Sequence, residues 1–327
     1  MNDETLEEKL RKMKVKCESQ EEIRKKIKEL QQQLDEFNGK VVDTNYDNQV
    51  YDKLIAIYKN CEPSKFYYKM EDYFKKKLAH IKRIDQHQIQ KVAGYIDNKL
   101  FLEKDEEEFN KSGIFLTKLI EICDSNTIVL KLKAGLNIHN FGYNLKRNAK
   151  ISLQGDIGSY LGFHMKTGFI SVEGNVCGIC GNVLQGGTIH IKNEVYESCG
   201  FDMYSGKIIV EGDVHGNCAE DMKGGTINVK GNVDGNLAYC LSGGKIIIEG
   251  DVHGTCGNSM SQGLVEVHGN IYSDIADWMH GGTIKVFGDQ KPSLAKQEYY
   301  DSYYNPYYES TIEAGIIYHK NKIIFSR

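Results

Sequence analysis

Hydrophobic and polar residues recur with a period of 19 from Lys150 to Asp289. When each unit is counted from Lys150 as position one, positions two and four hold valine, isoleucine or leucine in every unit, with mostly polar residues between them. This alternation is typical of a strand with one buried face. Position eight is always valine or isoleucine, and position thirteen is always glycine or alanine. Units this short cannot bury their apolar face alone, so the period predicts coils stacked on one another.

The stacking predicts a right-handed parallel β-helix, mainly β, over residues 127–290. We expect seven complete coils and a last strand at Thr283–Gly288, preceded by a less regular coil in which Phe141, Gly142 and Leu145 repeat the apolar, small and bulky positions. Exposed ion pairs contribute at most about 1 kcal/mol each, so charges at position five would set register more than stability. These charges alternate in sign along Glu173, Lys192, Glu211, Lys230 and Glu249.

Position six is glycine in all units but one, which has Asn193. Glycine and asparagine both tolerate a positive φ angle. We therefore expect each strand to end in a bend whose position-six residue has a positive φ. The glycines of this column include Gly174, Gly212, Gly231 and Gly250.

Position twelve holds four of the nine cysteines, and other units have leucine or isoleucine there. This column predicts that the four thiols are small core side chains. Cys177 and Cys180 form a C-x-x-C pair, but Cys177 at position nine would face outward, and no second pair supplies further zinc ligands. We expect core packing and a surface thiol here, without metal or redox chemistry. The four cysteines are Cys180, Cys199, Cys218 and Cys256.

Residues 1–40 have the spacing of a coiled-coil-like helical arm. Apolar residues recur at intervals of four and three in two runs, and the phase slips after Cys17. Ser19 and Glu22 form a capping-box pattern there, which favours two short helices or one interrupted coil. We expect the arm either to pair with a second copy of the chain or to pack on its own body. Its apolar residues include Leu6, Leu10, Ile23, Ile27, Leu30 and Leu34.

Residues 41–126 predict a small helical domain of four helices. Pro63 and Ser64 mark the start of the second helix, whose apolar stripe runs to Ile84, and the fourth is expected from Leu116 to Cys123. This segment shows no phosphate-binding loop, catalytic carboxylate pair or nucleophile constellation.

Residues 291–327 form a tyrosine-rich segment that contains Pro306. Its six clustered tyrosines would either cover the open last coil or stack on a neighbouring surface, and we favour the cap because an open coil exposes unpaired strand groups. Thr311–Tyr318 and Lys322–Phe325, joined around Asn321, predict a last pair of strands.

Composition indicates an ordinary protein of 327 residues, with 26% charged and 40% hydrophobic residues and a net charge of −4. This balance gives no reason to expect nucleic acid or a membrane surface as a partner. The start of the chain is polar and no stretch reaches the roughly 18 apolar residues of a membrane span. We expect a cytoplasmic protein.

Two outward columns of the β-helix carry candidate functional residues. Position nine includes His215, Asp234 and His253, but histidines two rungs apart are separated by about 9.6 Å, too far to share one metal ion. We therefore expect neither a metal nor a cofactor. Position three includes Ile209 and Ile247 among polar residues, and such apolar spots on a flat sheet suit a protein partner.

The glycine spacing supports a family resemblance. The segments Gly174-Asn175-Val176-Cys177-Gly178-Ile179-Cys180-Gly181 and Gly254-Thr255-Cys256-Gly257 resemble the GXGXG domain. This domain is the β-helix at the C-terminus of the glutamate synthase large subunit, and it also occurs in formylmethanofuran dehydrogenase. The resemblance covers about residues 130–290 and implies a structural spacer with no catalytic residues. The chain has nothing similar to the glutaminase, the flavin barrel or an iron–sulfur cysteine cluster of those proteins.

Together these features predict a non-catalytic assembly protein that docks protein partners. One alternative is an accessory subunit of a glutamate synthase-like or formylmethanofuran dehydrogenase-like complex with catalysis on other chains. A second alternative is a bactofilin-like polymer built end to end, which the caps expected at both ends disfavour.

Overall fold

The computed structural model describes residues 44–62, 67–81, 84–102, 106–132, 138–300, 306–310 and 312–327. The chain divides into two compact units, Met1–Val50 and Tyr51–Arg327. The predicted helical arm over residues 1–40 lies outside the described residues, and so do its apolar residues Leu6, Leu10, Ile23, Ile27, Leu30 and Leu34.

Four helices are present in the described part of the chain, and their ends differ from those expected. The helix that should have run to Ile84 ends at Leu78, and Ile84 instead forms a parallel bridge with Cys123. The apolar stripe continued past the helix end because Ile84 is buried, although it is not helical. The fourth helix begins at Glu106 rather than Leu116. The helices are α3 (Thr44–Lys59), α4 (Tyr67–Leu78), α5 (Gln86–Leu102) and α6 (Glu106–Glu121).

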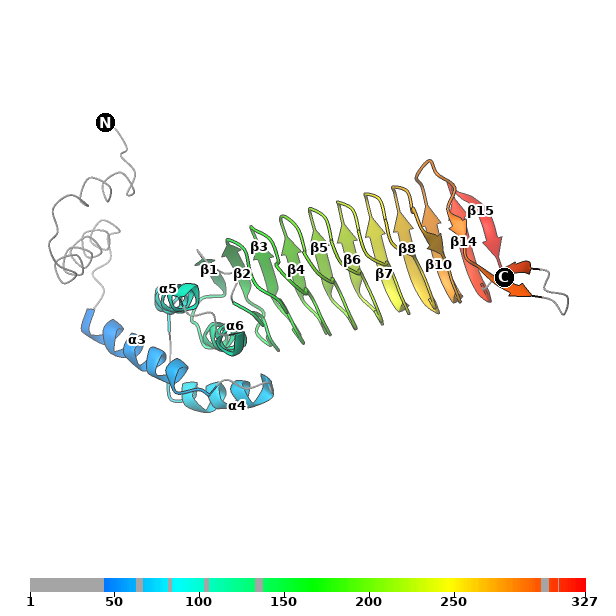
Figure 1. The fold of residues 1–327 in the computed structure, drawn as a ribbon. Helices are drawn as coiled ribbons and strands as arrows, with labels where there is room; N and C mark the ends of the chain where they lie inside the picture. The colour runs from blue at the N-terminus through cyan, green and yellow to red at the C-terminus, as the bar shows by residue number, and fades with distance from the viewer. Residues whose placement is uncertain are drawn as a thin grey trace, which may run out of the picture. The chain divides into compact units, whose positions relative to one another are not determined.

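Helix α6 packs directly on the first coil of the β region (Figure 1). The Thr117 hydroxyl accepts a hydrogen bond of 2.8 Å from the backbone N–H of Gly142. A Cβ added to Gly113 in α6 would lie 2.5 Å from the backbone nitrogen of Phe141, so only glycine permits this approach. The helices therefore close the N-terminal end of the stack.

A buried polar cluster links α4, α6 and this first coil. The Nζ of Lys118, which is 2% exposed, donates to Glu71 (3.0 Å) and Glu121 (2.8 Å), and the Nδ2 of Asn144 donates to both oxygens of Glu71. Burial alone would raise the pKa of Glu71, but hydrogen bonds from Lys75 and Asn144 and the charge of Lys118 outweigh it and lower that pKa. Removing one partner would leave an unpaired buried charge, so the cluster ties the helices to the coil.

The chain from Thr127 onward forms a parallel β-solenoid. Its main sheet has 11 strands in the order β1-β2-β3-β4-β5-β6-β7-β8-β10-β14-β15, and only the β14–β15 pair is antiparallel. Figure 1 shows these strands stacked like rungs. The strands of this sheet are β1 (Thr127–Lys131), β2 (Lys150–Gln154), β3 (Phe169–Val172), β4 (Thr188–Ile191), β5 (Lys207–Val210), β6 (Thr226–Val229), β7 (Ser242–Ile248), β8 (Gln262–Val267), β10 (His280–Val286), β14 (Ala314–His319) and β15 (Lys322–Ser326).

The in-register stacking predicted from the 19-residue period is confirmed. Ile151 pairs with Ile170, 19 residues later, and the same step recurs along the sheet to β10. The coil before Lys150 is less regular, as expected, because Thr127 pairs with Lys150, 23 residues later. At position five, Lys230 and Glu211 on adjacent coils form an ion pair of 2.5 Å.

The prediction for the position-six glycines is wrong. Only Gly155 has a positive φ there, at 121°, whereas Gly174, Gly212, Gly231 and Gly250 do not. Glycine is needed at these positions because successive backbones approach closely. A Cβ on Gly231 would lie 2.6 Å from both the carbonyl carbon and the oxygen of Gly212. The missing side chain, rather than the freedom of φ, explains the column.

Positive φ angles occur instead at three other positions of each coil. Positions thirteen and nineteen hold small residues such as Ala219 (62°) and Gly225 (93°). Position fifteen also has a positive φ in every coil, including at Val183 and Trp278, both at 52°. Large side chains adopt this conformation rarely, and a β-branched residue such as Val183 is strained in it. The stacked neighbours must therefore hold this bend in place.

Five inward columns, at positions two, four, eight, twelve and sixteen, fill the core. The predicted packing role of the position-twelve cysteines is confirmed, since all four are fully buried. Burial raises the pKa of Cys256 to about 12, so its thiol stays protonated. All the described cysteines are free thiols. The buried column contains Leu161, Cys180, Cys199, Cys218, Leu237, Cys256 and Ile275.

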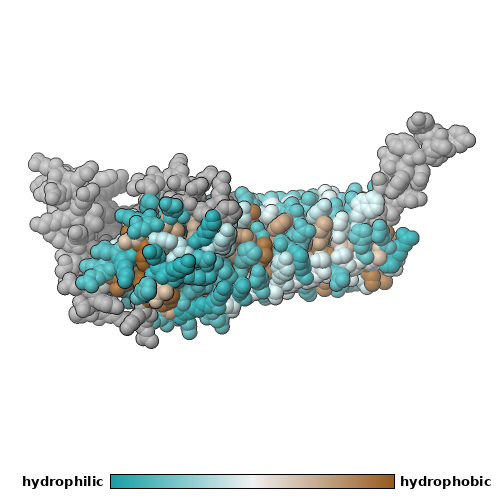
Figure 2. Space-filling model, turned by 90° about the horizontal axis from the view of Figure 1, so that it is seen from below, coloured by the Kyte–Doolittle hydropathy of each residue, from teal (hydrophilic) through white to brown (hydrophobic). Residues whose placement is uncertain are grey.

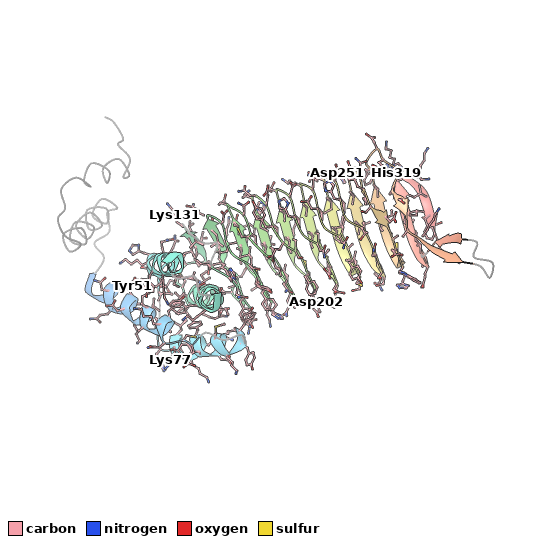
Figure 3. All side chains as sticks on the ribbon, viewed as in Figure 1. Tyr51, Lys77, Lys131, Asp202, Asp251 and His319 are labelled. Atoms are coloured by element: carbon pink, nitrogen blue, oxygen red, sulfur yellow. The ribbon has the colours of Figure 1, made fainter. Side chains whose placement is uncertain are left out.

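A polar column at position seven joins successive coils on the outside. The Oδ1 of Asp213 accepts a hydrogen bond from the backbone N–H of Asn232 (2.6 Å), and the Oδ1 of Asn232 accepts from that of Asp251 (2.8 Å). The alternation of acid and amide therefore provides acceptors for the next backbone, besides separating like charges. Figure 3 shows Asp251 at one margin of the stack and Asp202, at position fifteen, at the opposite margin.

The predicted last pair of strands is confirmed. Strands β14 and β15 are joined by a turn at Lys320 and Asn321, which have φ angles of 48° and 63°, and β14 pairs in parallel with β10. The last coil is thus extended by these two strands. The tyrosine segment forms a separate antiparallel pair, β12 (Lys296–Tyr300) with β13 (Pro306–Ser310), and its tyrosine side chains lie outside the described ones. A third small sheet pairs β9 (Asp274–Ile275) with β11 (Ser293–Leu294).

Substitution of a position-six glycine tests the close stacking of the coils. Gly231→Ala is expected to lower the free energy of unfolding by about 1–3 kcal/mol, because the new methyl group must displace the preceding backbone. Gly94 in α5 has no atom within 4 Å of an added Cβ, so the control Gly94→Ala should raise it by up to about 1 kcal/mol. Urea unfolding followed by circular dichroism measures both. A neutral Gly231→Ala would contradict the close approach.

Thiol reactivity tests the cysteine column. In the native protein, the half-buried Cys177 and Cys240 are expected to react with a maleimide well before Cys180, Cys199 or Cys218, because the reagent cannot reach thiols that are fully buried. Peptide mapping by mass spectrometry after timed labelling gives the rate at each site. Fast labelling of the buried column before unfolding would refute its place in the core.

Candidate functional site

The outward column at position nine gathers aromatic and titratable side chains on five successive coils. Position eight points into the core, so position nine points out, as the sequence predicted. Tyr196 and Tyr272 at the two ends are 48% and 51% exposed. We call this set the column-nine ladder: Tyr196, His215, Asp234, His253 and Tyr272.

Asp234 lies at the centre of the ladder and binds both histidines. Its Oδ2 is 2.7 Å from the Nδ1 of His215, and its Oδ1 is 3.1 Å from the Nδ1 of His253. An ionised carboxylate only accepts hydrogen bonds, so both Nδ1 atoms carry a proton and donate. The Nε2 of His215 also lies 3.4 Å from Glu194, which leaves this imidazole between two carboxylates.

Ring stacking extends the ladder to both tyrosines. Tyr196 stacks on His215 with ring centroids 5.2 Å apart, and Tyr272 stacks on His253 at 5.4 Å. The order is therefore tyrosine, histidine, aspartate, histidine and tyrosine, nearly symmetric about Asp234. Because neighbouring members hold one another through rings or hydrogen bonds, the ladder presents a preorganised surface.

The contacts of the ladder shift the pKa of its members in opposite directions. The hydrogen bond to Asp234, and then that to Glu194, raises the pKa of His215 against the effect of desolvation. The hydrogen bonds from His215 and then His253 lower the pKa of Asp234. The ladder therefore favours a protonated His215 beside an ionised Asp234.

The face around the ladder is acidic. Positions seven to eleven of the seven coils contain seven acidic residues and no lysine or arginine, and the histidines are the only basic residues. The strand face of positions one to five differs, because lysines and acids alternate there. The two faces would thus attract different charges. The acidic residues are Asp156, Glu194, Glu197, Asp213, Asp234, Asp251 and Asp274.

The hydrogen bonds described for the histidines of the ladder join them to carboxylates. Within the described residues, no group of three or more His, Cys, Asp and Glu side chains is arranged to hold a metal ion. His215, Asp234 and His253 do meet, but through hydrogen bonds that occupy both Nδ1 atoms. The hydrogen bonds described for the two imidazoles involve carboxylates, and none involves a serine, threonine or cysteine that could act as nucleophile.

The strand face holds the two predicted docking residues, Ile209 and Ile247. Ile209 lies between His190 and Asn228 on adjacent strands, and Ile247 lies between Asn228 and Glu266. Both side chains are half-buried rather than fully exposed. On the face seen in Figure 2, hydrophobic side chains of the solenoid form separate spots between hydrophilic ones.

Sequence reasoning identified the members of position nine but missed their mutual contacts. Tyr196 and Tyr272 share this column, and their stacking on the histidines was not foreseen. The signal was present, because rungs about 4.8 Å apart bring side chains of one column within contact distance.

Comparison with known proteins adds no further constraint. No family model matches the chain, and no curated protein matches it either. None of the described helices is long and apolar enough to cross a membrane.

The pH dependence of stability tests the ladder. The raised pKa of His215 implies stabilisation that is complete below its ordinary value of 6.5 and is lost as the pH rises through the folded value. The lowered pKa of Asp234 implies stabilisation present above its ordinary value of 3.8 and lost at lower pH. Asp234→Asn should therefore destabilise most between these limits, by at most about 1 kcal/mol because the site is exposed.

Two measurements check this expectation. Thermal unfolding of Asp234→Asn and the parent should differ at about pH 5–6 and converge once the pH exceeds the raised pKa of His215, where its imidazole is neutral. Titration of the imidazole resonances by NMR should show a lower pKa for His215 in the variant. An unchanged His215 pKa would contradict the hydrogen bond.

Proposed function

We propose that the chain is a non-catalytic, cytoplasmic assembly protein that holds protein partners at fixed positions along a rigid β-helix. The observation that carries this proposal is the register of the outward columns, which is maintained from β2 to β10. The seven rung spacings between β2 and β10 correspond to about 34 Å. Side chains at fixed intervals over such a length can define the separation of bound partners.

Two surfaces are proposed to contact partners. The column-nine ladder exposes two tyrosines, a residue type enriched at binding hot spots, on an acidic face. The strand face offers Ile209 and Ile247 as smaller apolar contacts. The pairing of the arm over residues 1–40 with a second copy stays a prediction, and no cofactor is proposed.

Charge insertion on the strand face tests docking. Ile209→Lys with Ile247→Lys is expected to weaken crosslinking to a native partner by about tenfold or more, because a lysine must then be desolvated at an apolar contact. Ser152→Lys, in the same column on β2, is the matched control and should leave crosslinking near the parent level. Quantitative crosslinking with mass spectrometry in the native host measures both.

The column-nine ladder is tested in the same experiment by Tyr196→Ser with Tyr272→Ser. If neither double variant changes any partner crosslink while both remain folded, the docking proposal fails. Circular dichroism and thermal unfolding supply the check on folding.

A second candidate function rests on the GXGXG resemblance over about residues 130–290. Under this hypothesis the chain is an accessory subunit of a glutamate synthase-like or formylmethanofuran dehydrogenase-like complex, with catalysis on other chains. Co-purification of a flavin or iron–sulfur protein from native extract would favour it. A bactofilin-like polymer is disfavoured by the helices packed against the N-terminal coil, and filaments of the pure protein in electron micrographs would revive it.

A further inference from the structure

The two edges of the 11-stranded sheet differ in whether their backbone hydrogen-bonding groups are covered. At the first edge, α5 lies against β1, and the side chain of Gln90 acts like a neighbouring strand. Its Nε2 donates to the carbonyl oxygen of Lys131 (3.0 Å), and its Oε1 accepts from the N–H of Lys131 (2.8 Å). Gln86 makes a single hydrogen bond to this strand, from its Nε2 to the carbonyl oxygen of Val129 (3.4 Å). These glutamines block further strand pairing at β1.

The second edge is β15, which pairs on one side only within the described part of the chain. Arg327 and Gly315 exchange both backbone hydrogen bonds, each 3.1 Å long. Residues in an antiparallel strand alternate between facing the partner and facing away. The N–H and C=O of Ser326 therefore point away from β14, where a further strand could pair with them.

The side chains of this edge are apolar at the centre and cationic around it. Ile323 is 58% exposed, and Phe325 is half-buried. The segment 320–327 carries three cations, Lys320, Lys322 and Arg327, and no acidic residue. Lys320 pairs with Asp289 at 2.8 Å, whereas Lys322 and Arg327 form no ion pair with any residue that the structure describes.

We propose that β15 accepts an extended segment of a partner protein as an additional strand, and that this segment has apolar residues in alternation and acidic residues at its ends. Backbone hydrogen bonds supply affinity in such strand addition, and the flanking side chains supply selectivity. The charges argue against a second copy of β15 as the occupant, because antiparallel self-pairing would bring Lys322 of one chain close to Arg327 of the other.

This inference rests on the proposed docking function, which supplies the partner, and it adds where and how one partner segment binds. It uses a different surface, however, because the sheet edge lies at the end of the stack. Variants on the strand face and variants at the edge can therefore fail separately.

A pair of synthetic peptides tests the proposal with the full chain. The first is fluorescein-labelled Glu-Glu-Val-Thr-Val-Thr-Val-Glu-Glu, and the second has lysine in place of every glutamate. Fluorescence anisotropy is expected to show saturable binding of the first and at least about tenfold weaker binding of the second. Hydrogen exchange measured by mass spectrometry should show protection of segment 320–327 on binding.

Ser326→Pro provides the decisive variant. It removes the outward N–H of the edge but leaves the bonds between Arg327 and Gly315, and proline is tolerated at such edge positions. Binding should weaken about tenfold or more, whereas Ser326→Thr, which keeps the N–H, should bind like the parent. Thermal unfolding must show that both variants are folded, and Ile247→Lys should bind the peptide normally.

Four outcomes would overturn the proposal: no saturable binding up to about 1 mM peptide, equal binding by a folded Ser326→Pro variant, equal affinity for the lysine peptide, or a dimer of the parent in sedimentation that Ser326→Pro abolishes. The last would identify a second copy as the occupant. If the parent chain does not bind the peptide while its partner crosslinks remain sensitive to Ile247→Lys, the strand-addition proposal fails and the docking proposal stands.

Discussion

The structure depends on the distance between successive backbones, which is set by hydrogen bonds between parallel strands. Once coils stack at about 4.8 Å, any residue that meets its equivalent on the next coil must suit that spacing. Position six strongly favours glycine, which every unit has except the one with Asn193, because a Cβ on these glycines would meet the preceding backbone. Position twelve accepts a thiol because this column lies in the apolar core, where cysteine, leucine and isoleucine are all fully buried. Position seven supplies an oxygen to the next N–H.

The same spacing makes the outer surface a set of straight columns, and function must be built from them. In the column-nine ladder this spacing places an aspartate between two histidines and a tyrosine against each histidine. A stack also has two ends, where backbone N–H and C=O groups would be left without strand partners unless other elements cover them. Here one end is closed by α5 and α6, and the other continues into β14 and β15.

Much of this architecture could be predicted from the sequence because a repeat shows each structural requirement several times over. The strands, the period and the buried Cys180 column followed from residue columns alone, and the last strand pair followed from two apolar segments joined around Asn321. The reason for glycine at position six did not, because a short contact and a positive φ select the same residue. The positive φ at position fifteen was also hidden, since Val183, Asp202 and Trp278 share no property that marks it. Contacts between unlike elements, such as Gln90 with Lys131, leave no periodic signal.

The most direct test of the account is a distance between two coils. Nitroxide labels attached through unnatural amino acids at Thr188 and Thr283, and in a second variant at Thr226 and Thr283, can be measured by pulsed electron paramagnetic resonance. In-register stacking predicts separations of about 24 Å for five rungs and about 14 Å for three, before the length of the labels is allowed for. Equal distances in the two variants, or a longer one for the closer pair, would contradict the stack.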